Sequence, residues 1–338
     1  MTIRMIAEKC GCSAATVSKA LNGAEDVSRE TAERVRRVAA ELGYMPNAAA
    51  RSMRTSRSYS FGVLFRDNAD TGLAHEFFSG LLNGFKRQAE ELGYDIFFIS
   101  GRLGGRTIRY AEHARYRNCD GVFIANESYK KPEVRELADC GIPAVTIDYT
   151  YDGCASVQSD NYQGVRDLVR YIHGMGHRRI AFIHGEDTPV TDVRVASFRQ
   201  TCRELGLDIP EAYVTEAVYC DPASCEAPTR RLLALETPPT CILYPDDTAY
   251  IGGRNEIYRQ GLRIPEDISA AGYDGIDLSQ ILRPRLTTLK QNADLMGSSA
   301  ARELVQAVEQ GKDYIPRRII IPGQVLPGET VGRAGETA

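Results

Sequence analysis

The sequence predicts a small N-terminal all-α head followed by an α/β core of two parallel-sheet subdomains. Within residues 2–43, apolar residues recur at helical spacing in three short segments. After Arg57, short apolar runs alternate with amphipathic segments, which is typical of βαβ units and a parallel sheet. The chain has 338 residues, which is enough for a small domain and one or two larger ones.

The first two predicted helices of the head have the pattern of a helix-turn-helix. The first helix has apolar residues at i, i+3, i+4 and i+7: Ile3, Ile6, Ala7 and Cys10. Gly11 allows a turn through positive φ, and Ser13 is a suitable N-cap for the second helix. In that helix Val17, Ala20 and Leu21 face inward. The residues expected to point outward at its N-terminal end are Ala14, Ala15, Thr16, Ser18 and Lys19.

The charge of this segment favours contact with nucleic acid. Up to Ser58 there are ten Lys and Arg and six Asp and Glu, a net charge of +4, whereas the whole chain is −4. The remaining residues therefore carry −8, so only the head has the sign that attracts phosphates. A three-helix bundle without any DNA contact is the alternative. A third helix is expected between an N-cap at Ser28 and Gly43.

The composition fits a soluble protein of a reducing compartment. Hydrophobic residues make up 43% of the chain and charged residues 25%, and no apolar run is long enough to span a bilayer. The N-terminus has no apolar signal region, and nine cysteines without framework spacing fit the cytoplasm. Cys10 and Cys12 lack a second ligand pair at zinc-finger spacing, so we expect no metal.

The α/β region divides into two series of expected strands. The first series covers 61–65, 94–99, 121–125 and 143–148, and the second covers 179–183, 240–243 and 268–273. We expect a helix-turn-helix domain at 1–45, a hinge helix and linker at 46–57, a core at 58–330 and a flexible tail at 331–338. Within the core we expect one subdomain at about 58–160 and 291–322, and the other at about 161–290 and 323–330. Ligands of such open sheets bind at the carboxyl ends of the strands.

Seven motifs occur in a characteristic order along the chain. They lie at 14–19 (AATVSK), 41–48 (ELGYMPNA), 159–164 (SDNYQG), 176–181 (GHRRIA), 261–269 (GLRIPEDIS), 272–274 (GYD) and 284–289 (PRLTTL). In this order the motifs resemble those of the LacI-type (lactose/galactose repressor) family of transcription regulators. The resemblance covers nearly the whole chain and implies a periplasmic-binding-protein-like core behind the head.

The resemblance implies a homodimer whose two heads bind a near-palindromic operator, one half-site each. Thr16 and Ser18 match positions that contact phosphates, while Ala14, Ala15 and Lys19 match positions that read bases. An alanine offers only a methyl contact, whereas Lys19 can donate to guanine; alternatively, Lys19 only neutralises a phosphate. The whole expected DNA-binding set is Ser13, Ala14, Ala15, Thr16, Ser18, Lys19, Asn22, Asn47, Ala50 and Met53.

Residues 46–53 resemble the hinge helix of the family, which inserts a leucine into the minor groove at the operator centre. Met53 takes that place here, and Asn47 resembles the usual N-cap of the hinge helix. An unbranched thioether can still act as a wedge between base pairs. The alternative is an exposed linker in which Met53 packs between subunits.

The effector cleft of the family suggests a second set of site residues. Arg194, Asp247 and Asp274 match charged positions that hold sugar hydroxyls, and Phe78 resembles an aromatic wall. Each has a structural alternative: an ion pair between helices for Arg194, a helix N-cap for Asp247, and the core for Phe78. The chain departs from the family pattern at 74–78, at 245–247 and at Tyr250, so the cleft is expected to be more acidic. His75 and Glu76 are added as contacts.

The resemblance implies a cytoplasmic, ligand-responsive repressor of carbohydrate-utilisation genes. It requires no cofactor beyond a small effector, expected to be a sugar or sugar derivative, and involves no membrane. A non-sugar effector or a corepressor is the alternative within the same class. An enzyme is disfavoured because the phosphate-binding, dinucleotide-binding and nucleophile-elbow motifs are missing from the sequence. A periplasmic binding protein would carry an export signal instead of a basic helical head.

Overall fold

The computed structural model describes residues 2–21, 24, 26–44, 52, 55, 57–66 and 72–335. These residues belong to two compact units, Met1–Tyr59 and Ser60–Ala338. Four residues of the expected DNA-binding set, Asn22, Asn47, Ala50 and Met53, lie outside the described residues.

The described residues of the first unit form three helices, α1 (Ile3–Cys10), α2 (Ala14–Leu21) and α3 (Arg29–Glu41). Gly11 ends α1 in the left-handed conformation (φ 62°), which a residue without a side chain adopts at little cost. The side chain of Ser28 accepts a hydrogen bond from the N–H of Thr31 and so caps α3, as predicted. Ile6, Val17 and Val35 are fully buried and join the three helices.

The first subdomain of the second unit is built around a six-stranded sheet with the order β13-β7-β6-β5-β1-β2. The strands are β1 (Ser60–Phe65), β2 (Asp95–Phe98), β5 (Gly121–Asn126), β6 (Ala144–Ile147), β7 (Ala155–Ser159) and β13 (Arg318–Ile321). All the described pairings in this sheet are parallel, with Val63 opposite both Phe98 and Phe123. The helices are α5 (Glu76–Glu91), α6 (Tyr110–Tyr116), α7 (Pro132–Ala138) and α13 (Ala293–Gln310).

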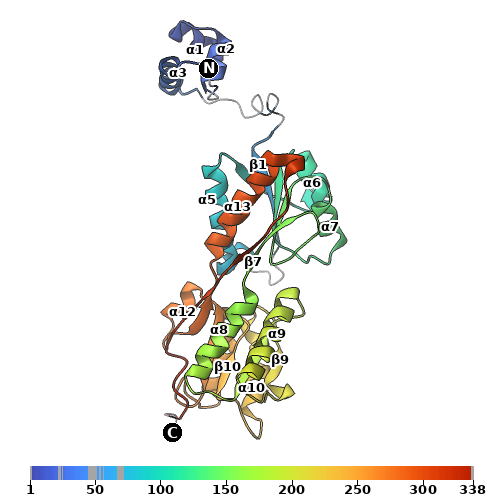
Figure 1. Cartoon of the computed structure of the whole chain (residues 1–338), viewed down its shortest axis with the longest axis vertical. Helices are drawn as coiled ribbons and strands as arrows, with labels where there is room; N and C mark the ends of the chain where they lie inside the picture. Colours follow the sequence, from blue (N-terminus) through green and yellow to red (C-terminus); the bar gives the residue numbers. More distant parts are fainter. Residues whose placement is uncertain are drawn as a thin grey trace. The chain divides into compact units, whose positions relative to one another are not determined.

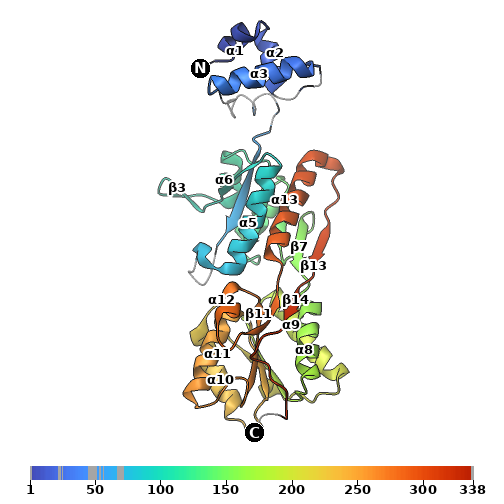
Figure 2. The same ribbon diagram turned by 90° about the vertical axis from the view of Figure 1, so that its left-hand side faces the viewer.

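The described part of this subdomain also has smaller elements. A 3-10 turn, η1 (Gly72–Ala74), precedes α5, and another, η3 (Gly311–Asp313), follows α13. The short antiparallel pair β3 (Arg102–Leu103) and β4 (Arg106–Thr107) forms a separate hairpin, seen in Figure 2 projecting beside α6. Helices α5 and α13 lie side by side although more than 200 positions separate them in sequence (Figure 1).

The second subdomain repeats the design with the strand order β14-β12-β11-β10-β8-β9. Its strands are β8 (Ile180–His184), β9 (Val214–Glu216), β10 (Cys241–Leu243), β11 (Ser269–Asp274), β12 (Thr287–Lys290) and β14 (Gln324–Leu326). Only β14 is antiparallel to its described neighbour. The helices are α8 (Asn161–Gly174), α9 (Pro189–Glu204), α10 (Pro222–Leu233), α11 (Asp247–Arg259) and α12 (Asp277–Ile281), with a 3-10 turn η2 (Glu211–Tyr213).

The chain passes between the two subdomains three times. The crossings lie between β7 and α8, between β12 and α13, and between β13 and β14. Each crossing follows the carboxyl end of a strand. The edges of both sheets where ligands of open α/β folds bind therefore face the region between the subdomains.

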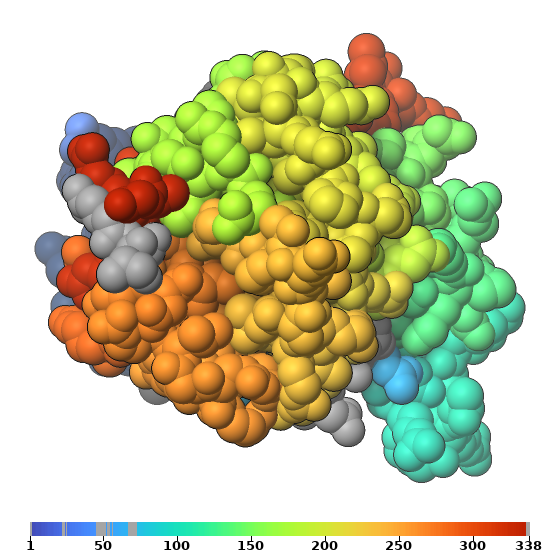
Figure 3. Space-filling model, turned by 90° about the horizontal axis from the view of Figure 1, so that it is seen from below, coloured from blue at the N-terminus to red at the C-terminus, as the bar shows by residue number. Residues whose placement is uncertain are grey.

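The expectation of a flexible tail at 331–338 is wrong for residues 331–335. Val331 is 4% exposed and belongs to the core of the second subdomain. The backbone around it is hydrogen-bonded, since Gly332 O lies 3.0 Å from Nε2 of His177 and the N–H of Ala334 donates to Met175 O. Figure 3 shows the red C-terminal residues lying against green residues of this subdomain. Residues 331–335 are therefore held in place by the buried side chain of Val331 and by backbone hydrogen bonds, although their sequence is mostly polar.

No helix within the described residues is long and apolar enough to cross a membrane.

Candidate functional site

The outer face of α2 carries the described residues of the expected DNA-binding set. Ser13, Ala14, Ala15 and Lys19 are exposed, and Thr16 and Ser18 are half-buried. Val17 and Ala20 are buried on the opposite side. The helix therefore presents small side chains and one lysine to solvent, as a recognition helix requires for entry into the major groove.

Two local contacts arrange this surface. The hydroxyl of Ser13 accepts the N–H of Thr16 at 3.0 Å and lies 2.9 Å from the Thr16 hydroxyl. The ammonium of Lys19 pairs with Asp26, and this hydrogen bond lowers the pKa of the Asp26 carboxyl. The pair is solvent-exposed, and such pairs contribute little to stability, so Lys19 can exchange it for a contact to DNA.

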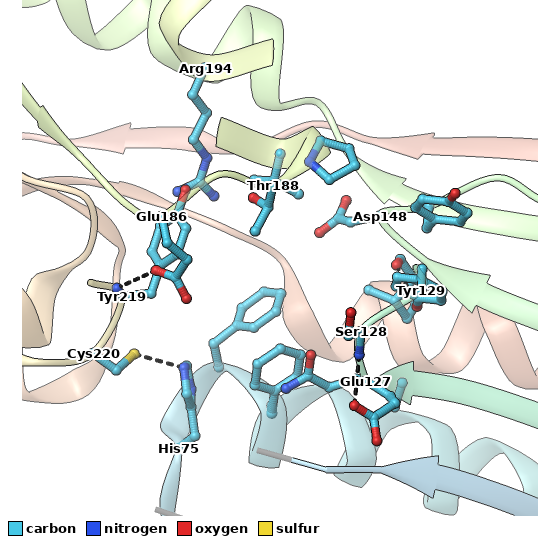
Figure 4. A pocket seen from close by; sticks show the side chains of 18 of the residues that line it. His75, Glu127, Ser128, Tyr129, Asp148, Glu186, Thr188, Arg194, Tyr219 and Cys220 are labelled. Carbon is cyan, nitrogen blue, oxygen red and sulfur yellow. Dashed lines mark hydrogen bonds between the residues drawn. The ribbon is translucent and has the colours of Figure 1, made fainter. Parts of the chain in front are cut away.

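A cavity of about 440 Å³ lies between the two subdomains of the second unit. Residues from both subdomains line it, among them Phe78, Asp148, Arg194, Asp274 and Gln291. Figure 4 shows Arg194 and Asp148 directed into this space from different elements. Its size is that of a small-molecule site.

Arg194 is a buried cation on α9 and is held from three sides. Its Nε donates to Asn161 Oδ1 at 2.8 Å, and its Nη1 donates to the carbonyl of Pro245 at 3.2 Å. The guanidinium stacks over the ring of Tyr273, 3.6 Å from the ring centroid. Its Nη2 has no hydrogen-bond partner among the described residues, which leaves a rigidly placed donor for a ligand.

Asp274 and Gln291 form a second fixed group at the ends of β11 and β12. Asp274 has a φ of 106°, a strained backbone conformation of the kind that functional sites retain. Its Oδ1 accepts the side-chain amide of Gln291 at 2.7 Å. Gln291 is 6% exposed, and its buried Oε1 has no partner in the described part of the chain. A buried unpaired acceptor on a cavity wall calls for a donor from a ligand or water.

Asp148 follows β6 and supplies a further acceptor. Its Oδ1 accepts the N–H of Ser159 at 2.8 Å, which ties the end of β6 to the first crossing between the subdomains. No described residue donates to its Oδ2, and φ at Asp148 is 51°. The ligand-facing set therefore contains one donor, from Arg194, and acceptors from Asp148, Asp274 and Gln291.

Ionisation of the carboxylates in this region costs free energy, because burial disfavours their charged form. Burial raises the pKa of Asp148 to about 6, although the N–H of Ser159 and the charge of Arg194 offset part of the shift. Burial also raises the pKa of Asp274, and the positive charge of Arg194 offsets part of that shift. The pKa of Asp246 is raised by burial and by the negative charge of Asp274. A ligand that donates hydrogen bonds to the oxygens of Asp148 and Asp274, which line the cavity, offsets part of this cost.

Aromatic side chains form the apolar walls of the cavity. Phe78 lines it, with ring contacts to Phe65 at 5.4 Å and to His75 at 4.7 Å between centroids. Tyr129 and Tyr149 line another part and stack with centroids 4.5 Å apart. Flat apolar walls beside a few fixed polar groups are typical of sites for small polar molecules.

Two of the expected effector residues do not line the cavity. Asp247 is buried at the start of α11, where its oxygens accept the hydroxyl of Thr288 at 2.6 Å and the N–H of Ile276 at 3.0 Å. Its neighbour Asp246 is the residue that caps α11, through the N–H of Ala249. Glu76 accepts the N–H of Asp277, which is a contact between the two subdomains. Arg194, Asp274, Phe78 and His75 do lie on the cavity wall.

Sequence reasoning missed Asp148 and Gln291. Both directly follow expected or observed strands, so the rule that ligands bind at the carboxyl ends of strands was the available signal. In the sequence, Asp148 is the last residue of the expected strand 143–148 and Gln291 lies at an expected subdomain boundary, so neither position by itself indicates a ligand contact.

Comparison with known proteins identifies both parts of the chain. The model of "Bacterial regulatory proteins, lacI family" matches residues 2–47, and that of the "Periplasmic binding protein-like domain" matches residues 169–331. The HTH-type transcriptional repressor CytR of Escherichia coli K12 is 30% identical over 351 residues, which cover 95% of each chain. The chain belongs to the lacI family.

Other lacI-family proteins are similar over the same extent. The HTH-type transcriptional regulator CelR of Thermobifida fusca is 28% identical over 97% of this chain and 98% of its own. The structure of a CelR–cellobiose complex superposes with a TM-score of 0.72 at 26% identity, covering 98% of this chain and 99% of that one. The Lac repressor dimer bound to operator and the anti-inducer ONPF has the same fold (TM-score 0.77, 24% identity, 98% and 99% covered).

These matches confirm the predicted fold and class of this lacI-family protein. It is a DNA-binding transcriptional regulator with a helix-turn-helix head and two α/β subdomains. The lacI family, to which the chain belongs, consists of bacterial regulatory proteins. Within the described residues no group of three or more His, Cys, Asp and Glu side chains is placed to hold a metal ion.

Proposed function

We propose that this protein is a repressor whose operator affinity changes when a small polyhydroxylated molecule binds between the two core subdomains. The observation that carries the proposal is the fixed polar set of the cavity. Arg194 Nη2 can donate to a ligand oxygen, and Asp148, Asp274 and Gln291 Oε1 can accept from hydroxyls. The aromatic walls suit the apolar C–H faces of a sugar ring.

The charge of the cavity favours an uncharged ligand over an anionic one. Its described lining carries five carboxylates, Glu127, Asp148, Glu186, Asp187 and Asp274, and two cations, Lys130 and Arg194. A phosphate or carboxylate on the ligand would meet this excess of negative charge in a region of low dielectric. Neutral sugars are therefore the preferred effectors, and CelR, a relative with a cellobiose complex, is consistent with that class.

On the DNA side, we propose that a homodimer binds a near-palindromic operator in the cytoplasm. One head reads one half-site through the exposed face of α2, so a two-fold-symmetric site requires two heads. Thr16 and Ser18 would contact phosphates, and Lys19 would read a base. The position of Met53 in the hinge makes it the candidate for insertion into the minor groove.

A thermal-shift screen of the full chain tests the effector assignment. A neutral sugar present at about 100 times its dissociation constant should stabilise the core by about 2.7 kcal/mol, an upward shift of roughly 5 °C. The matching sugar phosphate should give a much smaller shift.

Matched variants locate the binding site. Asp274→Asn and Arg194→Lys should abolish the shift, because they remove an acceptor oxygen and the rigidly placed Nη2 donor. Asp208→Asn, at an exposed carboxylate of the same subdomain, should keep it. If no carbohydrate stabilises the protein, or if the cavity variants respond like the control, the proposal is wrong.

A further inference from the structure

One contact across the cleft belongs to none of the groups assigned above. The Sγ of Cys220 lies 2.8 Å from Nε2 of His75 (Figure 4). His75 immediately precedes α5 in the first subdomain, and Cys220 lies in the loop before α10 in the second. Both residues line the cavity, so a thiol and an imidazole meet where a small molecule enters.

The other cysteines have different surroundings. Six of the nine are buried, and burial raises the pKa of Cys119 and Cys154 to about 11 and of Cys202 and Cys225 to about 12. Such thiols stay protonated and are poor nucleophiles. Cys12 and Cys140 are half-buried like Cys220, but no described imidazole is in hydrogen-bond contact with either.

Two carboxylates accept backbone N–H groups beside the pair, and two aromatic rings pack against His75. The N–H of Cys220 donates to Asp246 Oδ2 at 2.8 Å, and the adjacent N–H of Tyr219 donates to Glu186 Oε2 at 2.9 Å. The positive charge of His75 lowers the pKa of Asp246, so this carboxylate stabilises the imidazolium that forms when the thiol proton moves to Nε2. The rings of Phe77 and Phe78 pack against His75 and hold it toward the thiol. A thiolate beside an imidazolium is the reactive form of cysteine in nucleophilic sites.

The cavity gives a small molecule access to this pair. Its volume is about 440 Å³, and the unpaired buried Oε1 of Gln291 on the same wall independently indicates that the cavity takes a ligand. An adduct on Cys220 would occupy that space and separate Sγ from His75. Two other contacts join the subdomains nearby, Glu76 with the N–H of Asp277 and Lys130 with Asp187 at 3.5 Å, and they would be strained by the same adduct.

We propose that Cys220 and His75 form a reactive thiol–imidazole pair, and that modification of Cys220 by a small soft carbon electrophile holds the cleft open. With iodoacetamide, the sulfur attacks the methylene carbon, the S–C bond forms as the C–I bond breaks, and iodide leaves with the bonding electrons. The thiol proton passes to His75 and then to solvent. The effect on DNA rests on the proposed coupling of the cleft to operator affinity, whereas the reactivity does not.

The reactivity is tested by carbamidomethylation of the full chain with limiting iodoacetamide at pH 7, followed by peptide mass spectrometry over time. Cys220 should react at least about threefold faster than Cys140, because an imidazole partner raises the thiolate fraction more than it lowers nucleophilicity. His75→Gln should remove that advantage and leave the rate at Cys140 unchanged. If Cys220 reacts no faster than Cys140, or if His75→Gln does not slow it, the reactive pair is refuted.

The regulatory consequence is tested with the same protein after stoichiometric modification. Operator affinity should change by about fivefold or more, the lower end of typical coupling energies. The Cys220→Ser protein treated identically controls for modification at other thiols and should keep its affinity. Unchanged operator binding after complete modification of Cys220 overturns the regulatory role. The alkylation rates stay interpretable even if no sugar binds, so failure of the effector assignment is distinguishable.

Discussion

At the scale of single residues, Asp148 combines a cost in stability with a role in binding. Its folded pKa of about 6 lies above the usual aspartate value, chiefly because of burial. The stabilising contribution of the protonated form is thus fully present below pH 4 and is lost as the pH rises through 6. At neutral pH the carboxylate of Asp148 is ionised, which lowers the stability of the ligand-free core. Residues that bind ligands commonly carry such a cost.

Asp148→Asn should therefore stabilise the ligand-free protein at pH 7, by about 1–3 kcal/mol, and the gain should vanish near pH 4. The amide oxygen can still accept the N–H of Ser159, so the strand end stays in place. Sugar affinity should fall at least about tenfold. Thermal unfolding at several pH values measures the first effect and calorimetric titration the second. A variant that is less stable than the wild type at pH 7 would contradict this account of Asp148.

Lys19 is the other residue with a specific expected outcome. Lys19→Ala should reduce discrimination at one base pair of each half-site by about 1–3 kcal/mol, because a lysine–guanine contact is lost. Binding of a selected operator and its single-base variants measures this. Lys9→Ala, at the exposed end of α1, should leave base preference unaltered. A uniform loss of affinity across all operator variants for Lys19→Ala would show that Lys19 only neutralises a phosphate.

The family resemblance placed some of the cavity residues correctly, but it misplaced Asp247, where a single helical position decides the direction of the side chain. Arg194 and Asp274 line the cavity as expected. Asp247 does not, because α11 begins at Asp247 itself: Asp246 caps the helix, and Asp247 turns toward Thr288. One residue along a helix rotates a side chain by about 100°, and helix starts are not determined that accurately by sequence patterns.

At the scale of elements, the packing of α5 on α13 depends on glycines at their contact. A Cβ on Gly84 would lie 2.2 Å from the carbonyl oxygen of Asp294, and a Cβ on Gly297 would lie 1.9 Å from that of Leu81. Neither position can take a side chain unless the helices move apart. In Figures 1 and 2 the two helices run side by side along one face of the first sheet.

Gly84→Ala should therefore destabilise the core by about 2 kcal/mol or more. Gly80→Ala, one turn earlier on the same helix, is the matched control, since its Cβ would meet only Ala293 Cβ at an ordinary 3.4 Å. It should be neutral or stabilise by up to about 1 kcal/mol, because alanine is the better helix former. Chemical denaturation measures both. Equal stability of the two variants would contradict the close contact of the helices.

The expected strands were those whose sequences are continuously apolar. Seven such runs correspond to β1, β2, β5, β6, β8, β10 and β11, with each end shifted by at most one residue. The strands β7, β13 and β14 were missed because pairing with distant parts of the chain, and not local composition, makes them strands. β7 contains Ser156, Gln158 and Ser159, and β13 pairs with it across more than 150 positions.

At the scale of the whole molecule, a ligand can alter DNA binding only if it binds two arrangements of the core with different affinity. The cavity lies between two subdomains joined by three chain crossings, so the relative arrangement of the subdomains is the variable that a ligand can bias. Arg194 and Asp274 come from the second subdomain and Asp148 from the first. A ligand that contacts both sides is bound most tightly when the cleft is closed.

One titration shows whether a sugar in this cavity controls operator binding. The full chain is titrated against a fluorescently labelled operator, with and without a saturating concentration of the neutral sugar that stabilises it, alongside Asp274→Asn. We expect the sugar to change operator affinity by roughly 5- to 150-fold in the wild type and to leave that of the variant unchanged. Identical operator affinity with and without saturating sugar in the wild type would contradict it.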